Sequence, residues 1–221
     1  MRQDEPLGGE RDALRREIPP DRERESPPPD LRARLRREKI QARDRLDPAV
    51  REALSRRIVQ RIVSCPAFQR AGTVLIYRAI RGEVRLTALE TAAEAAGKRL
   101  AYPRCTGARE ITAYLPGGPE AWAPGCFGIL EPVPEQSEPI PPEELDLVIC
   151  PCTVFDERCG RMGMGGGFYD RYLPRCTNAP AACVAFEVQK APRVPMAAWD
   201  RFTDLVLTEQ AVYQNPLGSE K

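Results

Sequence analysis

Five glycines fall within eight positions, from Gly160 to Gly167, in the stretch ERCGRMGMGGGFYDRYL. Glycine has no Cβ atom, so the backbone N–H groups of such a loop can approach a ligand closely and turn toward an anion. Arg161 would add a guanidinium fork for phosphate oxygens, and Asp170 places a carboxylate just after the loop. These residue types favour a phosphate-binding loop. The alternative is a flexible glycine turn that packs a strand against a helix and leaves Arg161 in solvent.

The loop does not match the two common nucleotide-binding patterns. A P-loop ends in Gly-Lys followed by Ser or Thr, whereas this loop ends in Gly167, Phe168 and Tyr169. A Rossmann fingerprint that starts at Gly163 and Gly165 would need glycine at position 168. The loop is nevertheless expected between a central strand and a helix that begins near Gly167. Ligands of α/β sheets bind at such junctions, where the positive end of a helix attracts anions.

The chain has no histidine and eight cysteines. The first fact excludes Ser-His-Asp and Cys-His catalysis, so any chemistry must use carboxylates, arginines, backbone amides or a bound metal. The cysteines are scattered and several fall within apolar runs, but none forms a Cys-x-x-Cys pair. A structural zinc site is therefore not expected. Reduced thiols in a cytoplasmic protein are the simpler interpretation.

The apolar pattern predicts the elements that would position these residues. Runs rich in β-branched residues predict strands, and apolar residues at every fourth position or alanine-rich runs predict helices. Strands are expected at 73–77, 99–103, 111–115, 145–151, 182–187 and 204–209, and helices near 31–39, at 48–62, at 86–97 and from about 167. The run 145–151 is almost continuously apolar, as in a central strand covered on both faces. Alternating strands and helices indicate a layered α/β domain, with the proline-rich stretch 132–142 as a surface excursion.

The composition suits one globular domain with an additional N-terminal segment, since the chain has 221 residues of which 42% are hydrophobic. Residues 1–30 contain six prolines, many charges and few large apolar residues. We expect them to form a disordered leader that is neither a secretory signal nor a mitochondrial presequence. The domain is expected over 31–213, followed by a tail at 214–221. No apolar run approaches the length of a membrane span, and the net charge of +1 gives no general affinity for nucleic acid.

The glycine loop, RMGMGGGFYDR at 161–171, stands in a series of further short motifs. They are RARLR (32–36), Tyr77 with GEV (82–84), YPR (102–104), GILEP (128–132), LDLVICP (145–151), FD (155–156), AFEVQ (185–189) and VLTE (206–209). In this order they resemble the motifs of the 5-formyltetrahydrofolate cyclo-ligases, also called methenyltetrahydrofolate synthetases. The signature of that family is an Arg-Leu-Gly-x-Gly-x-Gly-Tyr-Tyr-Asp loop. The resemblance extends from about residue 31 to residue 209.

The resemblance implies a three-layer α/β sandwich with a largely parallel central sheet, similar to the fold of sugar-phosphate isomerases and CoA transferases. Enzymes of this family use ATP and magnesium to convert 5-formyltetrahydrofolate into 5,10-methenyltetrahydrofolate, ADP and phosphate. The formyl oxygen attacks the terminal phosphoryl group, and nitrogen 10 of the folate then closes the ring as phosphate leaves. This chemistry needs positioning and charge neutralisation more than covalent work by the protein. The expected protein is a cytoplasmic monomer that acts on a small molecule, with no nucleic-acid or membrane partner.

The resemblance also implies roles for individual residues. Arg36 and Arg161 are expected to be catalytic. ATP would contact Arg32, which stands where the family usually has lysine, together with Arg36, Arg161, Met162, Gly163, Met164, Gly165, Gly166, Gly167, Phe168 and Tyr169. The folate would contact Arg78, Glu83, Met164, Gly165, Gly166, Gly167 and Phe168, with the Glu83 carboxylate accepting from pterin N–H groups. Asp170 and Asp200 would hold magnesium through carboxylate oxygens.

Two other functions stay open on the sequence. A sugar-phosphate or CoA-handling enzyme could share the fold, since fold alone does not decide function, and it would need no ATP. A noncatalytic regulator could keep the folate pocket and bind 5-formyltetrahydrofolate without hydrolysing ATP.

Overall fold

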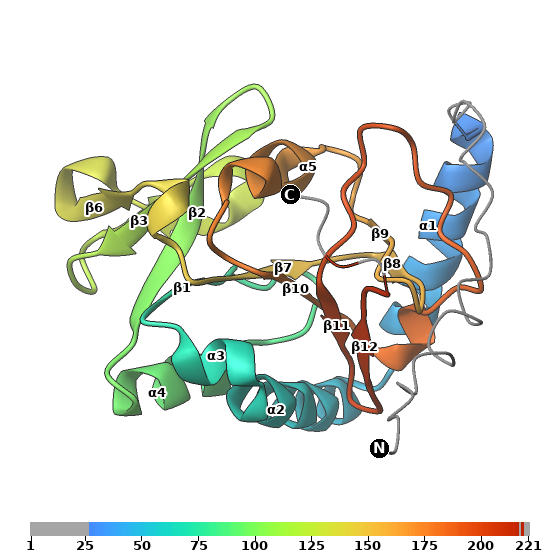
Figure 1. The fold of residues 1–221 in the computed structure, drawn as a ribbon, viewed down its shortest axis with the longest axis horizontal. Helices are drawn as coiled ribbons and strands as arrows, with labels where there is room; N and C mark the ends of the chain where they lie inside the picture. Colours follow the sequence, from blue (N-terminus) through green and yellow to red (C-terminus); the bar gives the residue numbers. More distant parts are fainter. Residues whose placement is uncertain (1–26, 217, 219–221) are drawn as a thin grey trace, which may run out of the picture.

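The structure of this chain is a computed structural model that describes residues 27–216 and residue 218 (Figure 1). Most of the predicted leader lies outside the described residues, and helix α1 (Pro29–Asp44) begins at the last two positions assigned to it. The predicted domain and tail boundaries therefore stay predictions. Within the described part of the chain, no helix is both long and apolar enough to cross a membrane.

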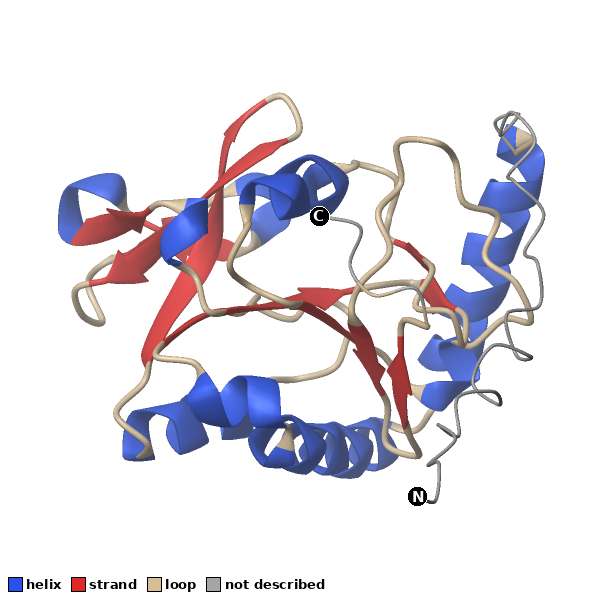
Figure 2. Ribbon diagram, viewed as in Figure 1, coloured by secondary structure: helices blue, strands red, loops and turns tan. Residues whose placement is uncertain are grey.

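A sheet of eight strands runs through the middle of the molecule, in the order β12-β11-β10-β7-β1-β2-β3-β6 (Figure 2). The strands are β1 (Thr73–Leu75), β2 (Arg99–Gly107), β3 (Glu110–Pro116), β6 (Ser137–Ile140), β7 (Leu147–Pro151), β10 (Ala181–Val184), β11 (Leu205–Leu207) and β12 (Val212–Gln214). The five strands from β11 to β2 are parallel, whereas β12, β3 and β6 pair antiparallel at the two edges. The predicted α/β class with a largely parallel sheet is confirmed.

Helices cover both faces of the sheet and complete the predicted three layers (Figure 1). One face carries α2 (Pro48–Ser64), α3 (Pro66–Arg70) and α4 (Thr87–Ala95), and the other carries α5 (Phe168–Tyr172). Strand β7 shows why the sheet needs both layers, because its side chains alternate between the two faces. Leu147 and Ile149 pack in the core cluster between the sheet and α2, whereas Val148 packs with Tyr172 of α5.

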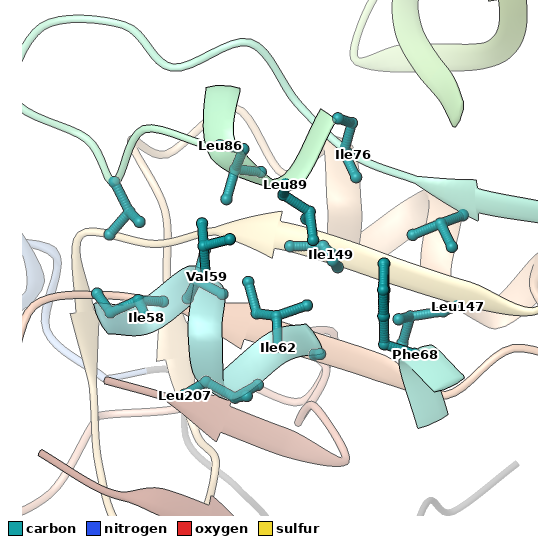
Figure 3. Packing of buried hydrophobic residues seen from close by; sticks show 14 of the residues in the cluster. Ile58, Val59, Ile62, Phe68, Ile76, Leu86, Leu89, Leu147, Ile149 and Leu207 are labelled. Carbon is teal, nitrogen blue, oxygen red and sulfur yellow. The ribbon is translucent and has the colours of Figure 1, made fainter. Parts of the chain in front are cut away.

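Helix α2 supplies much of the core cluster that lies between it and the sheet. The Asp47 carboxylate accepts hydrogen bonds from the N–H groups of Ala49 and Val50, which fixes the start of the helix. Ile58 and Ile62 are buried against the sheet (Figure 3). Val50 begins the same fourfold series but is 45% exposed, so the first turn of α2 lies beyond the core.

The proline-rich stretch 132–142, predicted as a surface excursion, lies largely at the surface but also contributes an edge strand to the sheet, which the sequence did not predict. It contains β6, which pairs with β3 at the edge of the sheet and places Pro139 opposite Tyr114. Proline has no N–H group to donate, and an edge strand leaves one side free of partners. The preceding residues form a small separate hairpin of β4 (Trp122–Pro124) and β5 (Leu130–Pro132).

The glycine loop does not follow β7 directly, because a second hairpin of β8 (Val154–Phe155) and β9 (Arg161–Met162) stands between them. Each of its strands has only two residues, which is too short to show an apolar period. The Asp156 carboxylate holds the turn of this hairpin by accepting from the N–H groups of Arg158 and Gly160. The hairpin carries Arg161 to the start of the loop.

Strands β1 and β7 mark the point at which the chain changes direction across the sheet. They lie side by side and parallel, but the chain proceeds from β1 to β2 on one side and from β7 to β10 on the other. In open α/β sheets a crevice forms beyond the carboxyl ends of two such strands. A binding site is therefore expected after Leu75 and Pro151.

Candidate functional site

A cavity of about 1000 Å³ lies where the topology places it, and residues that follow β1 and β7 line it. Its size is at the upper end of the range usual for small-molecule sites, about 300–1000 Å³. Every site residue predicted from the sequence lines this cavity: Arg32, Arg36, Arg78, Glu83, Arg161, Met162, Gly163, Met164, Gly165, Gly166, Gly167, Phe168, Tyr169, Asp170 and Asp200. The fold thus brings together residues from the first helix, the strand ends, the glycine loop and the C-terminal third.

The cavity wall carries more positive than negative charge, since eight arginines and four carboxylates line it. Two of the arginines, Arg32 and Arg36, are four residues apart on α1 and therefore share one face of that helix. Arg32 Nη1 donates to Asp200 Oδ2 at 2.6 Å, and Arg36 Nε donates to the carbonyl oxygen of Gly163 at 2.9 Å. Burial, and next the nearby charge of Arg32, lowers the pKa of Arg36. Such a wall suits a polyanionic ligand.

The glycine loop has a backbone that other residues rarely adopt. Gly165 has φ +103° and Gly167, which precedes α5, has φ +69°. A Cβ atom at Gly165 would lie 3.8 Å from Cζ of Arg36, so a side chain there would point at the α1 arginine. Helix α5 has only five residues, so the helix end predicted to attract anions adds little. Arginines carry most of the positive charge instead.

Arg161 is not in solvent, so the alternative that left it solvated is wrong. Its side chain is 3% exposed, and Nη2 donates to Asp170 Oδ1 at 3.0 Å. Its Nε has no hydrogen-bond partner among the described residues, and the same holds for the buried hydroxyl of Tyr169. Buried polar groups are normally hydrogen-bonded. A ligand or a water molecule in the cavity is the expected partner of both.

Asp170 and Asp200 supply carboxylate oxygens of the kind that bind a magnesium ion. Asp170 Oδ1 accepts from Arg161 and from the N–H of Arg201, and Asp200 Oδ2 accepts from Arg32 and from the N–H of Ala197. The second oxygen of each carboxylate accepts no hydrogen bond from the described residues. Carboxylate oxygens are the ligands that this hard cation prefers. The two residues therefore fit magnesium, although each also serves as the counter-ion of an arginine.

A second group of lining residues offers flat surfaces and a carboxylate. Arg78 and Tyr102 line the cavity, and both contact Trp122, which does not: the Arg78 guanidinium lies 3.9 Å from the Trp122 ring centroid, and Tyr102 meets that ring edge-on at 4.8 Å. Glu83 Oε2 accepts from the N–H of Ile80 at 3.0 Å, and burial raises the pKa of this carboxyl. Aromatic walls beside a few polar acceptors suit a heteroaromatic ring that carries N–H groups.

Several lining residues received no role from the sequence. Phe127, 75% exposed, meets Phe168 of the glycine loop edge-on with ring centroids 6.1 Å apart. Tyr102 and the exposed Trp199 also line the cavity. Tyr102 belongs to the motif YPR and Phe127 directly precedes the motif GILEP, so these motifs were the available indication that the two residues belong to the site. Nothing local in the sequence indicated which way the side chains would point.

Comparisons with known proteins agree with this geometry. Residues 29–209 match the 5-formyltetrahydrofolate cyclo-ligase family. The Escherichia coli K12 protein named 5-formyltetrahydrofolate cyclo-ligase is 28% identical over 180 residues, which cover 79% of this chain and 98% of that protein. The Haemophilus influenzae protein of the same name is 38% identical over 89 residues, covering 39% of this chain and 46% of that protein. The NMR structure of Aquifex aeolicus 5,10-methenyltetrahydrofolate synthetase matches with a TM-score of 0.75 and 34% identity, over 84% of this chain and 93% of that one.

Proposed function

Because this chain belongs to the 5-formyltetrahydrofolate cyclo-ligase family, we propose that it catalyses the ATP-dependent cyclisation of 5-formyltetrahydrofolate to 5,10-methenyltetrahydrofolate, with release of ADP and phosphate. The observation that carries the proposal is the cavity at the ends of β1 and β7, which is lined on one side by the glycine loop with arginines around it and on another by aromatic residues and a carboxylate. A triphosphate suits the first and a pterin the second.

Arg32, Arg36 and residues 161–169 are the proposed ATP contacts. Support comes from the hydrogen bond between Arg36 and Gly163, which holds a guanidinium against the glycine loop before any ligand binds. A preorganised donor of this kind stabilises charge that develops as the formyl oxygen attacks the terminal phosphoryl group, at no reorganisation cost. Arg36 is therefore the catalytic residue that the geometry supports most directly.

Arg161 is the second proposed catalytic residue. Its guanidinium is buried and fixed by Asp170, and its Nε lacks a partner among the described residues. A phosphoryl oxygen would satisfy that group. Asp170 and Asp200 would hold magnesium, which when bound would neutralise charge on the transferred phosphoryl group.

Arg78, Glu83 and Phe168 are the proposed folate contacts. Glu83 would accept from the amino and ring N–H groups of the pterin, for which it must be ionised. Support comes from the place of Glu83 beside Ile80 at the cavity wall and from Arg78 and Tyr102, which line the same cavity and offer flat surfaces for the ring. Fixing the folate here would keep nitrogen 10 close to the formyl carbon during ring closure.

Action in the cytoplasm, as a monomer and without a nucleic-acid partner, belongs to the same proposal. The eight free cysteines support a reducing compartment. Light scattering of the purified protein tests the monomer, and a concentration-independent mass near 24.7 kDa is expected.

The direct test mixes the protein with 5-formyltetrahydrofolate, ATP and magnesium and follows the absorbance of the methenyl product. We expect a signal that requires ATP. Folded protein that gives no ATP-dependent signal contradicts the proposal. Tight folate binding without ATP hydrolysis would then indicate a noncatalytic regulator, and turnover of a sugar phosphate or CoA ester without ATP would indicate the other alternative.

A further inference from the structure

Two thiols and one carboxylate converge beside the proposed folate contacts. Ligand atoms of Cys105, Cys126 and Glu131 all lie within 4.8 Å of one another. The three residues belong to β2, to the short helical turn Cys126–Gly128 and to β5. Their spacing matches no zinc motif, so the sequence predicted no such site. The pairing of the β4–β5 hairpin and the course of β2 bring them together.

The carboxylate of Glu131 is built into this cluster. Glu131 is 5% exposed, and its two oxygens accept from the N–H groups of Cys105 at 3.3 Å and of Cys126 at 3.2 Å. A Cβ atom at Gly125 would overlap the Glu131 carboxylate, so glycine is what allows the chain to close over it. The carboxylate thus sits between the backbones of both cysteines, where it can face both sulfurs.

Glu131 also lacks a positive partner. No lysine or arginine in the described part of the chain forms an ion pair with it. Buried charges in proteins are normally paired with an opposite charge or bound to a metal ion. A nearly buried carboxylate that faces two sulfurs, with no counter-ion of its own, therefore points to a cation.

We propose that Cys105, Cys126 and Glu131 bind a thiophilic divalent cation, for which Zn²⁺ is the best fit. Sulfur ligands favour zinc-like ions over magnesium, and zinc accepts two thiolates and a carboxylate in a tetrahedral set. With Zn–S bonds of about 2.3 Å the sulfurs would stand about 3.8 Å apart, so the cluster would contract by ~1 Å or less. The exposed Cys126 lies in a short turn that can make this adjustment.

The fourth ligand position would face the cavity. Cys105 and Glu131 both line the cavity wall, so water or a substrate atom can reach the ion from that side. Phe127 follows Cys126 directly and meets Phe168 of the glycine loop edge-on. A bound ion would fasten the turn 126–128 to β2 and thereby fix Phe127 against the glycine loop. Binding of the ion itself does not depend on the proposed function.

Titration of the reduced, metal-free full chain with Cd²⁺ tests the site, because cadmium thiolates absorb in the ultraviolet, and Zn²⁺ should displace the signal. We expect one equivalent of Cd²⁺ to saturate it. Cys126→Ser should remove about half of the absorbance, because one of the two thiolates is lost. It should weaken zinc binding about 100-fold or more, because losing a ligand itself costs more affinity than losing a group that only supports a ligand. Glu131→Gln should weaken zinc binding while keeping both thiolates. Cys65→Ser, at a partly exposed thiol after α2, is the matched control and should change nothing.

Thermal melting establishes that each variant is folded. Cys126 is exposed, so Cys126→Ser is the variant expected to disturb folding least. Reduced wild-type protein that binds no stoichiometric Cd²⁺ or Zn²⁺ would overturn the proposal. An unchanged cadmium signal in Cys126→Ser would do the same. If two thiols are lost on air oxidation and the reduced chain binds no zinc, the cluster is a redox pair and not a metal site.

Discussion

Asp170→Asn tests the most specific contact in the site, the ion pair between Asp170 and the buried guanidinium of Arg161. Asparagine keeps the shape and one oxygen acceptor, so the hydrogen bond at 3.0 Å can survive while the negative charge is lost. Arg161 is 3% exposed and forms no other ion pair within the described residues. The substitution therefore leaves a buried cation without a counter-ion.

Removing one partner of a buried pair typically costs about 3–5 kcal/mol. The cost here should be lower, at about 2–3 kcal/mol, because Asp170 is 17% exposed and the acceptor oxygen remains. For a domain of this size that corresponds to a fall in melting temperature of roughly 4–12 °C. Turnover should also fall steeply, and the magnesium concentration at half-maximal rate should rise, because asparagine is a weaker ligand for a hard cation.

The assay combines thermal melts with magnesium titrations of the initial rate. Asp47→Asn is the matched control, since Asp47 stands at the start of α2, accepts from two N–H groups and is replaced there by an equally good capping residue. Its melting temperature and magnesium dependence should be those of the wild type.

Two results would refute the reasoning separately. If Asp170→Asn melts like Asp47→Asn, the residue steadies only the helix start and the ion pair contributes no stability. If its magnesium midpoint is unshifted and turnover is near normal, Asp170 does not bind the metal. A lower melting temperature with an unshifted magnesium midpoint would mean that the Asp170–Arg161 ion pair contributes stability but that Asp170 does not bind the metal.

Two further predictions concern the ends of the proposed site. Gly165→Val forces a branched residue into φ +103° and toward Arg36, so the ATP affinity measured by calorimetry should fall at least tenfold. The control Gly97→Val, at φ +64° after α4, should lower the melting temperature but leave ATP affinity unchanged. Equal losses of ATP affinity in the two variants would refute the role of the loop. Burial raises the pKa of Glu83, so the folded chain holds that proton more tightly than the unfolded chain and stability is lost as pH rises from about 4.3 through the raised value. Glu83→Gln should therefore melt higher than wild type at neutral pH, with the difference vanishing in acid, while its KM for folate rises; a lower melting temperature at neutral pH would contradict the burial argument.

Local pattern was enough to predict the main elements and the layered class. Strand β7 (Leu147–Pro151) formed within the predicted run 145–151 because its side chains are apolar on both faces, a property that the short segment carries in itself. The glycine loop was predictable for the same reason, since glycine marks backbone that other residues avoid. The family resemblance then indicated which positions would gather, and all of them line one cavity.

Pairing between distant segments was not predictable, because it depends on topology and burial and not on local preference. Strand β6 was missed since proline discourages strands everywhere except at an edge, and only the folded sheet shows where the edge is. The two-residue strands β8 and β9 exist through their partner.

The sequence by itself determined the backbone preferences, the apolar faces and the supply of arginines, carboxylates and glycines, because these depend on residue type and near neighbours. Only the tertiary structure decided which charges meet. Arg32 reaches Asp200 across 168 positions, Arg161 is buried against Asp170, and Cys105 meets Cys126 and Glu131. Burial fixes these pairings, since a charge or thiol removed from water must find its partner among whatever the packed elements bring beside it.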